Sequence, residues 1–114
     1  MKVIIAGSRA FNDYELLKKV CDKELGNYTD IEIVSGTANG ADLLGEKYAE
    51  ERNYPVKKFP ADWSLGKQAG YLRNYDMVQY SEMLICFWDG KSNGSKSVIR
   101  MAKKRGLKVI VQNF

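Results

Sequence analysis

Short runs rich in Val and Ile alternate with helical stretches along the whole chain. The runs are KVIIAG, IEIVSG, the weaker VKKF, MLICFW and LKVIVQ, at residues 2–7, 31–36, 56–59, 83–88 and 107–112. Most are continuously apolar rather than alternating, as expected of strands covered on both faces. Strands that alternate with helices are joined by right-handed crossovers and form a parallel sheet. We therefore predict an α/β fold of three layers with an open, mainly parallel sheet of about five strands.

The stretches between the strands have the periodicity and boundary residues of helices. They span residues 12–27, 40–53, 66–81 and 95–106. Asn12 or Asp13 would cap the first, and Gly26 and Gly106 would end the first and the last. The residues expected to face the core are Leu16, Leu17, Val20, Cys21, Leu43, Leu44, Tyr48, Val98, Ile99 and Ala102.

The length of 114 residues suits one domain with a single core, so we expect residues 1–114 to form one ligand-binding domain. The apolar share of 45% and the charged share of 28% are those of an ordinary globular chain. No apolar stretch approaches the ~20 residues that cross a bilayer, and the start MKVIIAGSR is too short for a signal peptide. A cytoplasmic location and no contact with membranes are the expectation.

Several catalytic classes are excluded by missing residue types. The chain has no histidine, which removes Ser–His–Asp and Cys–His catalysis and the usual nitrogen-rich zinc sites. Cys21 and Cys86 sit among apolar neighbours without CxxC spacing, so we interpret them as reduced core residues. Neither GxGxxG nor GxxxxGK[ST] occurs, which disfavours a dinucleotide fingerprint and a Mg-ATP site. We predict no metal and no cofactor.

Three predicted strand ends carry small residues directly before a helix. They read AGSRAF, SGTANGAD and DGKSNGSKS, at residues 6–11, 35–42 and 89–97. Glycine lets the backbone approach a ligand closely, and free N–H groups at a helix start attract anions. Each turn alone could be an ordinary tight turn. Because ligands of open parallel sheets bind at the carboxyl ends of the strands, three such turns at one edge predict a phosphate-bearing ligand.

Side chains near these turns could add contacts. Arg9 and Arg73 could grip phosphate or carboxylate in a fork, or form surface ion pairs. Trp63 could stack on a base or pin a loop to the core. Asp42 and Asp89 could cap helices or hold ribose hydroxyls.

The net charge of +4 and the isoelectric point near 9.0 favour an anionic partner without naming it. A basic cluster lies at the end of the last predicted helix and is most simply a solvated face that suits a helix C-terminus. A nucleic-acid partner for it is possible but less favoured. The cluster comprises Arg100, Lys103, Lys104, Arg105 and Lys108.

Motifs from these segments together resemble the YspA/YpsA-related branch of the SLOG superfamily. The motifs are GSR-x-F, SG-x-A-x-GAD, ADW, AG-x-x-RN-x-x-M and WDG-x-S-x-G, in consistent order over almost the whole chain. This Rossmann-like group includes the lonely-guy phosphoribohydrolases and the DNA-processing protein A fold. The resemblance implies a domain that binds a nucleotide or nucleotide-derived ligand, such as an ADP-ribose derivative or a nucleoside monophosphate. Many relatives occur in phages or mobile elements, sometimes in anti-phage signalling. Relatives often dimerise, so a homodimer stays open.

The chain departs from these relatives at informative positions. Thr37 and Asn39 stand where the branch commonly has glycine and arginine, so one cationic contact is missing. The catalytic arginine of the lonely-guy enzymes carries over to Arg73, whereas their catalytic glutamate falls on Val98. Valine cannot transfer a proton or stabilise an oxocarbenium ion.

We therefore expect binding rather than hydrolysis and name no catalytic residue. A nucleotide phosphoribohydrolase remains the alternative, since Asp42, Asp89 or Glu46 could replace the missing glutamate from another direction. A nucleic-acid-binding protein is the further alternative. The predicted ligand-binding residues are Gly7, Ser8, Arg9, Phe11, Ser35, Gly36, Thr37, Gly40, Ala41, Asp42, Trp63, Arg73, Asn74, Asp89, Gly90, Ser92, Gly94 and Ser95.

Overall fold

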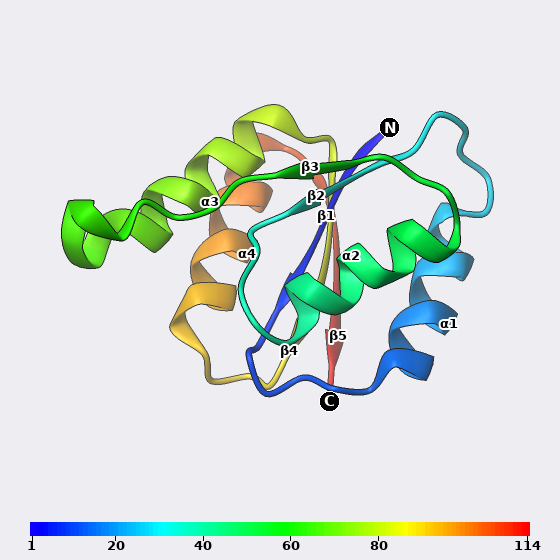
Figure 1. The fold of residues 1–114 in the computed structure, drawn as a ribbon, viewed down its shortest axis with the longest axis horizontal. Coiled ribbons are helices and arrows are strands. Elements are labelled where there is room, and N and C mark those ends of the chain that lie inside the picture. The colour runs from blue at the N-terminus through cyan, green and yellow to red at the C-terminus, as the bar shows by residue number, and fades with distance from the viewer.

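Five parallel strands form one sheet in the computed structural model, which describes residues 1–114 (Figure 1). In chain order they are β1 (Lys2–Gly7), β2 (Glu32–Ser35), β3 (Val56–Lys58), β4 (Met83–Trp88) and β5 (Lys108–Asn113). Their order across the sheet is β3-β2-β1-β4-β5, and every neighbouring pair is parallel. The predicted Rossmann-like α/β fold is confirmed.

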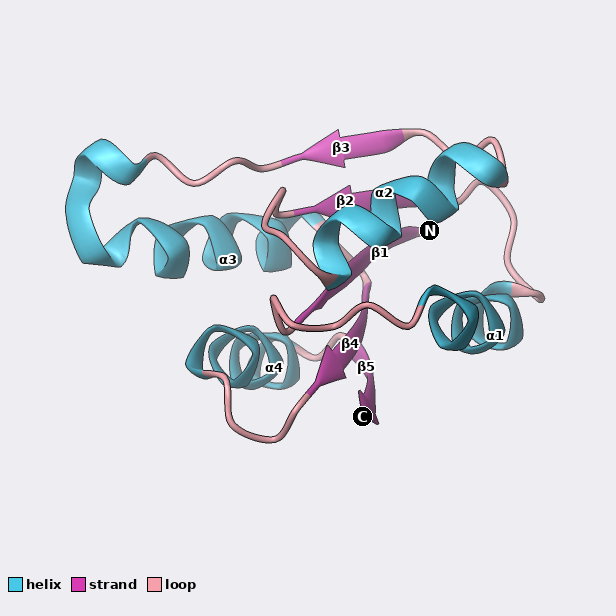
Figure 2. Ribbon diagram, turned by 60° about the horizontal axis from the view of Figure 1, so that its bottom comes forward, coloured by secondary structure: helices cyan, strands magenta, loops and turns pink.

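Four α-helices cover the sheet in two layers. They are α1 (Tyr14–Leu25), α2 (Ala41–Glu51), α3 (Ala69–Tyr80) and α4 (Asn93–Arg105), and a short 3₁₀ helix, η1 (Trp63–Gln68), precedes α3. Helices α1 and α2 pack on one face, and α3 and α4 on the other (Figure 2). None of these helices has the length and apolarity that a membrane crossing requires.

The central strands explain why the apolar runs are continuous. In β1, Val3 and Ile5 contact the α1–α2 layer, while Ile4 and Ala6 contact the α3–α4 layer. Burial on both faces is what a central parallel strand requires. Cys21 and Cys86 are free thiols in the two layers of the core, as predicted, and burial raises the pKa of each to about 12.

The strand order reverses direction between β1 and β4. From β1 the chain builds outward to β2 and β3, and then it returns past β1 to add β4 and β5 on the other side. The loops that leave β1 and β4 therefore run to opposite faces of the sheet. A crevice opens between such loops at the carboxyl edge of an open sheet.

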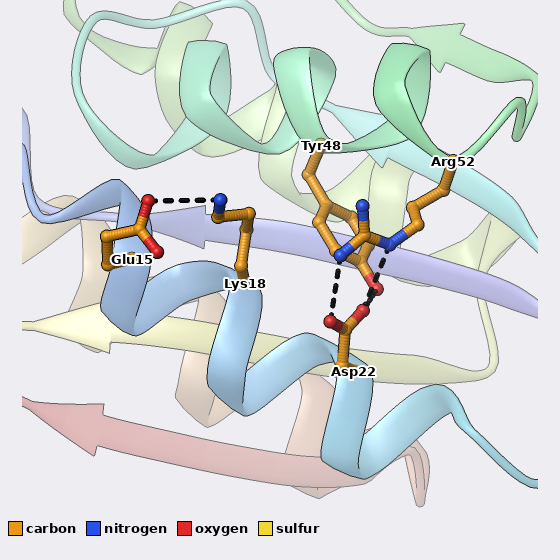
Figure 3. Close-up of polar contacts among 5 residues, drawn as sticks. All are labelled: Glu15, Lys18, Asp22, Tyr48 and Arg52. Carbon is orange, nitrogen blue, oxygen red and sulfur yellow. Dashed lines mark hydrogen bonds and ion pairs between the residues drawn. The ribbon is translucent and has the colours of Figure 1, made fainter.

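A polar cluster joins α1 to α2 on the outside of the first layer (Figure 3). The Asp22 carboxylate accepts hydrogen bonds from Tyr48 Oη at 2.6 Å and from Arg52 Nη2 at 2.8 Å and Nε at 3.2 Å. These bonds, led by the one from Arg52, hold the pKa of Asp22 below its usual range. A Glu15–Lys18 ion pair lies one turn earlier on α1.

Two local expectations were wrong. Leu43 is 44% exposed rather than inward, because it lies in the first turn of α2, where Ala41 and Asp42 turn toward the protein instead. The predicted helix 66–81 is divided into η1 and α3. Gly66 lies inside η1 and has φ of +79°, which is not helical, so it kinks η1, and the regular α-helix begins only at Ala69.

Candidate functional site

The three small-residue turns lie together around a cleft of about 410 Å³ at the crevice between β1 and β4. Ser8 links all three. Its Oγ lies 3.2 Å from Ser92 Oγ and accepts the Asp89 N–H at 3.2 Å, and its carbonyl accepts the Ala41 N–H at 3.4 Å. The predicted site residues that line the cleft are Gly7, Ser8, Arg9, Asp42, Arg73, Asn74, Asp89, Ser92, Gly94 and Ser95.

Glycines at two of these turns are required by close backbone approach. A Cβ on Gly7 would lie 2.1 Å from the carbonyl oxygen of Phe87, so only glycine lets β1 end beside β4 in this way. A Cβ on Gly40, where φ is +81°, would lie 2.4 Å from the carbonyl oxygen of Ser8. These glycines bring the turns together, and Gly7 also lines the cleft.

The start of α4 supplies unpaired donors to the cleft. Its N-cap residue, Ser92, makes no capping hydrogen bond, and the N–H groups of Asn93, Gly94 and Ser95 have no acceptor in the protein. A Cβ placed on Gly94 would meet no protein atom within 4 Å, so the space beside this glycine is open. Unpaired N–H groups at a helix start, together with the helix dipole, favour an anion.

Two guanidinium groups border the cleft in different ways. Arg9 is exposed and makes neither a hydrogen bond nor an ion pair with the protein. Arg73 is half-buried, donates from Nε to Asn74 Oδ1 at 3.1 Å and from Nη1 to the Gly36 carbonyl, and burial lowers its pKa. Asn74 in turn donates to the Gly94 carbonyl at 3.3 Å, which ties α3 to the start of α4. Arg9 is thus the free cation, and Arg73 is the fixed one.

The two candidate carboxylates have distinct roles. Asp89 Oδ1 accepts the N–H groups of Lys91 and Ser92, both at 2.8 Å, and these bonds lower its pKa and shape the turn before α4. Asp42 is 5% exposed, and its Oδ2 accepts the Ala38 N–H at 3.2 Å. Burial raises the pKa of Asp42 to about 6, against the opposing effects of the Ala38 N–H and Arg73. Asp42 therefore holds its proton more readily than an exposed carboxyl does.

The floor of the cleft is apolar. Ala6, Met77 and Val98 line it, and Val98 is 2% exposed. Sequence reasoning did not assign Ala6, Met77 or the rim residues Ala10 and Ala38 to the site. Met77 lies three residues after Asn74, and Val98 lies three residues after Ser95. This helical spacing could have indicated that Met77 and Val98 line the same cleft as Asn74 and Ser95.

A second hollow of about 480 Å³ adjoins the cleft and shares Arg9, Ala38 and Arg73 with it. Thr37 and Trp63 also line this hollow, and the Trp63 side chain is 59% exposed on η1. An aromatic face is therefore available next to the two arginines.

Several predicted site residues belong to the scaffold instead. Phe11 is 2% exposed and stacks on Phe87 with ring centroids 4.7 Å apart, so the expectation that it offers a face to a base was wrong. Ser35 is fully buried and donates to Glu46 Oε2 at 2.6 Å, which leaves it no room for a ligand contact. Ala41 is also fully buried, and Gly90 lies outside both hollows.

These features define a Rossmann-like domain with an anion-attracting cleft at the point where its strand order reverses. Residues 1–66 match the family described as the YspA, cpYpsA-related SLOG family. The match covers more than half of the chain, so the chain belongs to this family. No curated protein matches the chain.

A solved structure with the same fold is that of DNA processing protein A from Helicobacter pylori, described for its single-stranded DNA binding mode. The TM-score is 0.68 at 23% sequence identity, with 97% of this chain and 64% of the other chain covered. At this identity the likeness shows the fold alone. The present chain spans less than two thirds of the length of that protein.

Proposed function

We propose that the cleft binds a nucleotide or a nucleotide-derived ligand, such as a nucleoside monophosphate or an ADP-ribose derivative. The observation that carries the proposal is the unpaired start of α4 facing the unpaired Arg9 across a cleft. Donors without acceptors and a cation without an anion together fit one phosphate group. Family membership and the single-stranded DNA binding of the Helicobacter pylori protein support a phosphate-bearing partner of this class.

The phosphate end of the ligand would lie against α4. The N–H groups of Gly94 and Ser95 would donate to its oxygens, and Gly94 leaves the space for them. Arg9 would close over the phosphate from the β1 turn, because no protein group holds its guanidinium elsewhere. Arg73 would contribute charge from a fixed position.

The organic part of the ligand would extend into the adjoining hollow. Trp63 offers an exposed indole face there, and stacking on an aromatic ring accepts any base. Asp42 lines the cleft and is hydrogen-bonded to Ala38, which both hollows share, so it would accept a hydrogen bond from a sugar hydroxyl there.

The apolar floor supports binding rather than N-glycosidic cleavage. Val98 supplies no carboxylate at the place where the lonely-guy enzymes have their glutamate. Loss of general acid–base help costs about 10²–10⁴ in rate. A role in phage, mobile-element or host-defence signalling rests on the family resemblance.

Calorimetry against AMP, ADP-ribose and isomers of cyclic ADP-ribose tests the proposal. At least one should bind, and Arg9→Gln or Gly94→Ala should weaken that binding by about tenfold or more, since each disturbs a charge-assisted phosphate contact. Neither change removes a contact of the folded protein. The control is Lys19→Gln, which removes an exposed cation from α1.

Absence of heat with every ligand would refute the proposal, as would equal effects of Arg9→Gln and Lys19→Gln. Release of free base from AMP by the wild type, lost in Arg73→Ala, would instead establish the phosphoribohydrolase.

A further inference from the structure

A third hollow surface lies apart from both the cleft and the hollow that adjoins it. A groove of about 430 Å³ runs between α3 and α4 and shares no lining residue with the cleft. Tyr71 lines it from α3, and Lys96, Arg100, Met101 and Lys104 line it from α4. Cations therefore form one wall of the groove, and an exposed aromatic ring lies on the other.

The cations on α4 form an unneutralised row. Lys96, Arg100 and Lys104 recur every four residues, so they share one face of the helix at steps of about 6 Å. Helix α4 contains five Lys and Arg residues and no Asp or Glu. None of the five takes part in an ion pair. Like charges at this spacing repel one another and destabilise the helix unless an anion lies between them.

The helix dipole accounts for only part of this row. Cations in the last turn, such as Lys104, interact favourably with the dipole. Lys96 lies close to the start of α4, where the dipole disfavours a positive charge. Since neither the dipole nor an acidic partner explains Lys96 and Arg100, a negatively charged ligand of extended shape fits the row.

Exposed tyrosines on α3 indicate which kind of polyanion fits the groove. Tyr71 is 59% exposed in the groove wall. Tyr75, one helical turn further along α3, is 50% exposed and lies outside the lining of the groove itself. Exposed rings beside a row of cations suit unpaired bases, which can stack on them while the phosphates follow the charges. In a duplex the bases are already stacked on one another and present only their edges.

We propose that the α3–α4 groove binds single-stranded nucleic acid. Its phosphates lie along Lys96, Arg100 and Lys104, and its bases stack on Tyr71 and Tyr75. The proposal is independent of the nucleotide cleft, because the two surfaces use different residues.

Fluorescence anisotropy with a labelled single strand of about 20 nucleotides tests it, with the duplex of the same sequence as a second probe. The wild type should bind the single strand more tightly, with an affinity that falls steeply between about 50 and 200 mM salt. Lys96→Gln/Arg100→Gln should weaken binding and reduce the salt slope by about 1.4, which is about 0.7 for each phosphate that is no longer neutralised. Tyr71→Ala/Tyr75→Ala should weaken single-strand binding about fivefold or more and leave the salt slope unchanged.

The matched control is Lys19→Gln/Lys23→Gln. It removes the same charge at the same spacing from the exposed side of α1, in the other helix layer. Binding should be nearly unchanged in this variant. If Lys96→Gln/Arg100→Gln and Lys19→Gln/Lys23→Gln lost equal affinity, the binding would depend on net charge only, and the proposal would be overturned. Binding of the duplex as tight as that of the single strand, with no effect of the tyrosine changes, would also overturn it, as would no binding at low salt.

Discussion

Thr37 holds a backbone conformation that β-branched residues rarely adopt. Its φ is +64°, in the left-handed region. Hydrogen bonds hold the turn on both sides: the Gly36 carbonyl accepts from Arg73, the Thr37 N–H donates to Ser35 Oγ at 3.1 Å, and the Ala38 N–H donates to Asp42. The family resemblance implies glycine at this place, and a threonine here keeps the geometry of the turn at the cost of strain.

Thr37→Gly should therefore raise the free energy of unfolding by about 1 kcal/mol, because glycine adopts positive φ without a steric cost. Chemical denaturation measures the change. Thr29→Gly is the matched control, since Thr29 is an exposed loop threonine without positive φ. It should lower stability slightly through the greater freedom of the unfolded chain. Destabilisation by Thr37→Gly as large as that by Thr29→Gly would show that Thr37 is not strained.

Asp42 should make stability depend on pH in the direction opposite to most carboxylates. Burial raises its folded-state pKa to about 6, while its unfolded value is about 3.9. The folded state then binds the extra proton between these values, so this group's contribution is fully present below pH about 4 and is lost as pH rises through about 6. Arg73 and Arg9 favour the charged form, and Glu46 opposes it.

Asp42→Asn removes this dependence. Relative to the wild type, the variant should gain stability as pH rises from about 4 to about 7, by roughly 3 kcal/mol at most. Denaturation at a series of pH values measures the difference. The matched control is Asp76→Asn, which removes an exposed carboxyl from α3. A flat difference for Asp42→Asn would contradict the expected titration.

At the scale of elements, a glycine sets the distance between α2 and the sheet. Gly45 lies in the middle of α2 and is buried. A Cβ at this position would come within 2.8 Å of both Cβ and Cγ2 of Ile5 on β1. Helix α2 therefore rests its backbone on the central strand, and this close packing helps bring the α2 end of the cleft to the β1 turn.

Gly45→Ala should lower the free energy of unfolding by about 1–3 kcal/mol, because the methyl group forces α2 away from β1. The better helix propensity of alanine, about 1 kcal/mol, would only partly offset this cost. Gly70→Ala is the control within α3, where the nearest atom to a new Cβ is Trp63 Cη2 at an ordinary 3.6 Å. That variant should be equally stable or more stable. Equal effects of the two changes in thermal melts would rule out the proposed close contact.

At the scale of the whole molecule, the sequence predicted the alternation of strands and helices, the parallel sheet and the meeting of the three turns. These depend on periodicity and on short-range signals that survive in any tertiary context. It did not predict that Phe11 is buried against Phe87, or that Arg73 is held by the Gly36 carbonyl. Those contacts join residues far apart in the chain, and their geometry follows from how the layers pack.

The arm formed by η1 and the start of α3 projects beyond the sheet in both ribbon views (Figures 1 and 2). No residue of η1 is buried, and Trp63 and Leu65 are 59% and 51% exposed. The centres of β1 and β4 are instead fully buried. Since few buried contacts hold the arm, it should open without unfolding the core.

Hydrogen exchange with mass spectrometry should show this difference. Amides in residues 61–68 should exchange rapidly, and those of β1 and β4 should exchange only on global unfolding. Equal protection of the arm and the central strands would contradict a separately opening arm. If the proposed ligand also stacks on Trp63, saturating ligand should slow exchange in the arm and in the core of the wild type. In Trp63→Ala, saturating ligand should still slow exchange in the core, because the ligand would still contact the turns of β1 and α4. Exchange in the arm should not slow, because the ligand would have no aromatic ring on η1 to stack on.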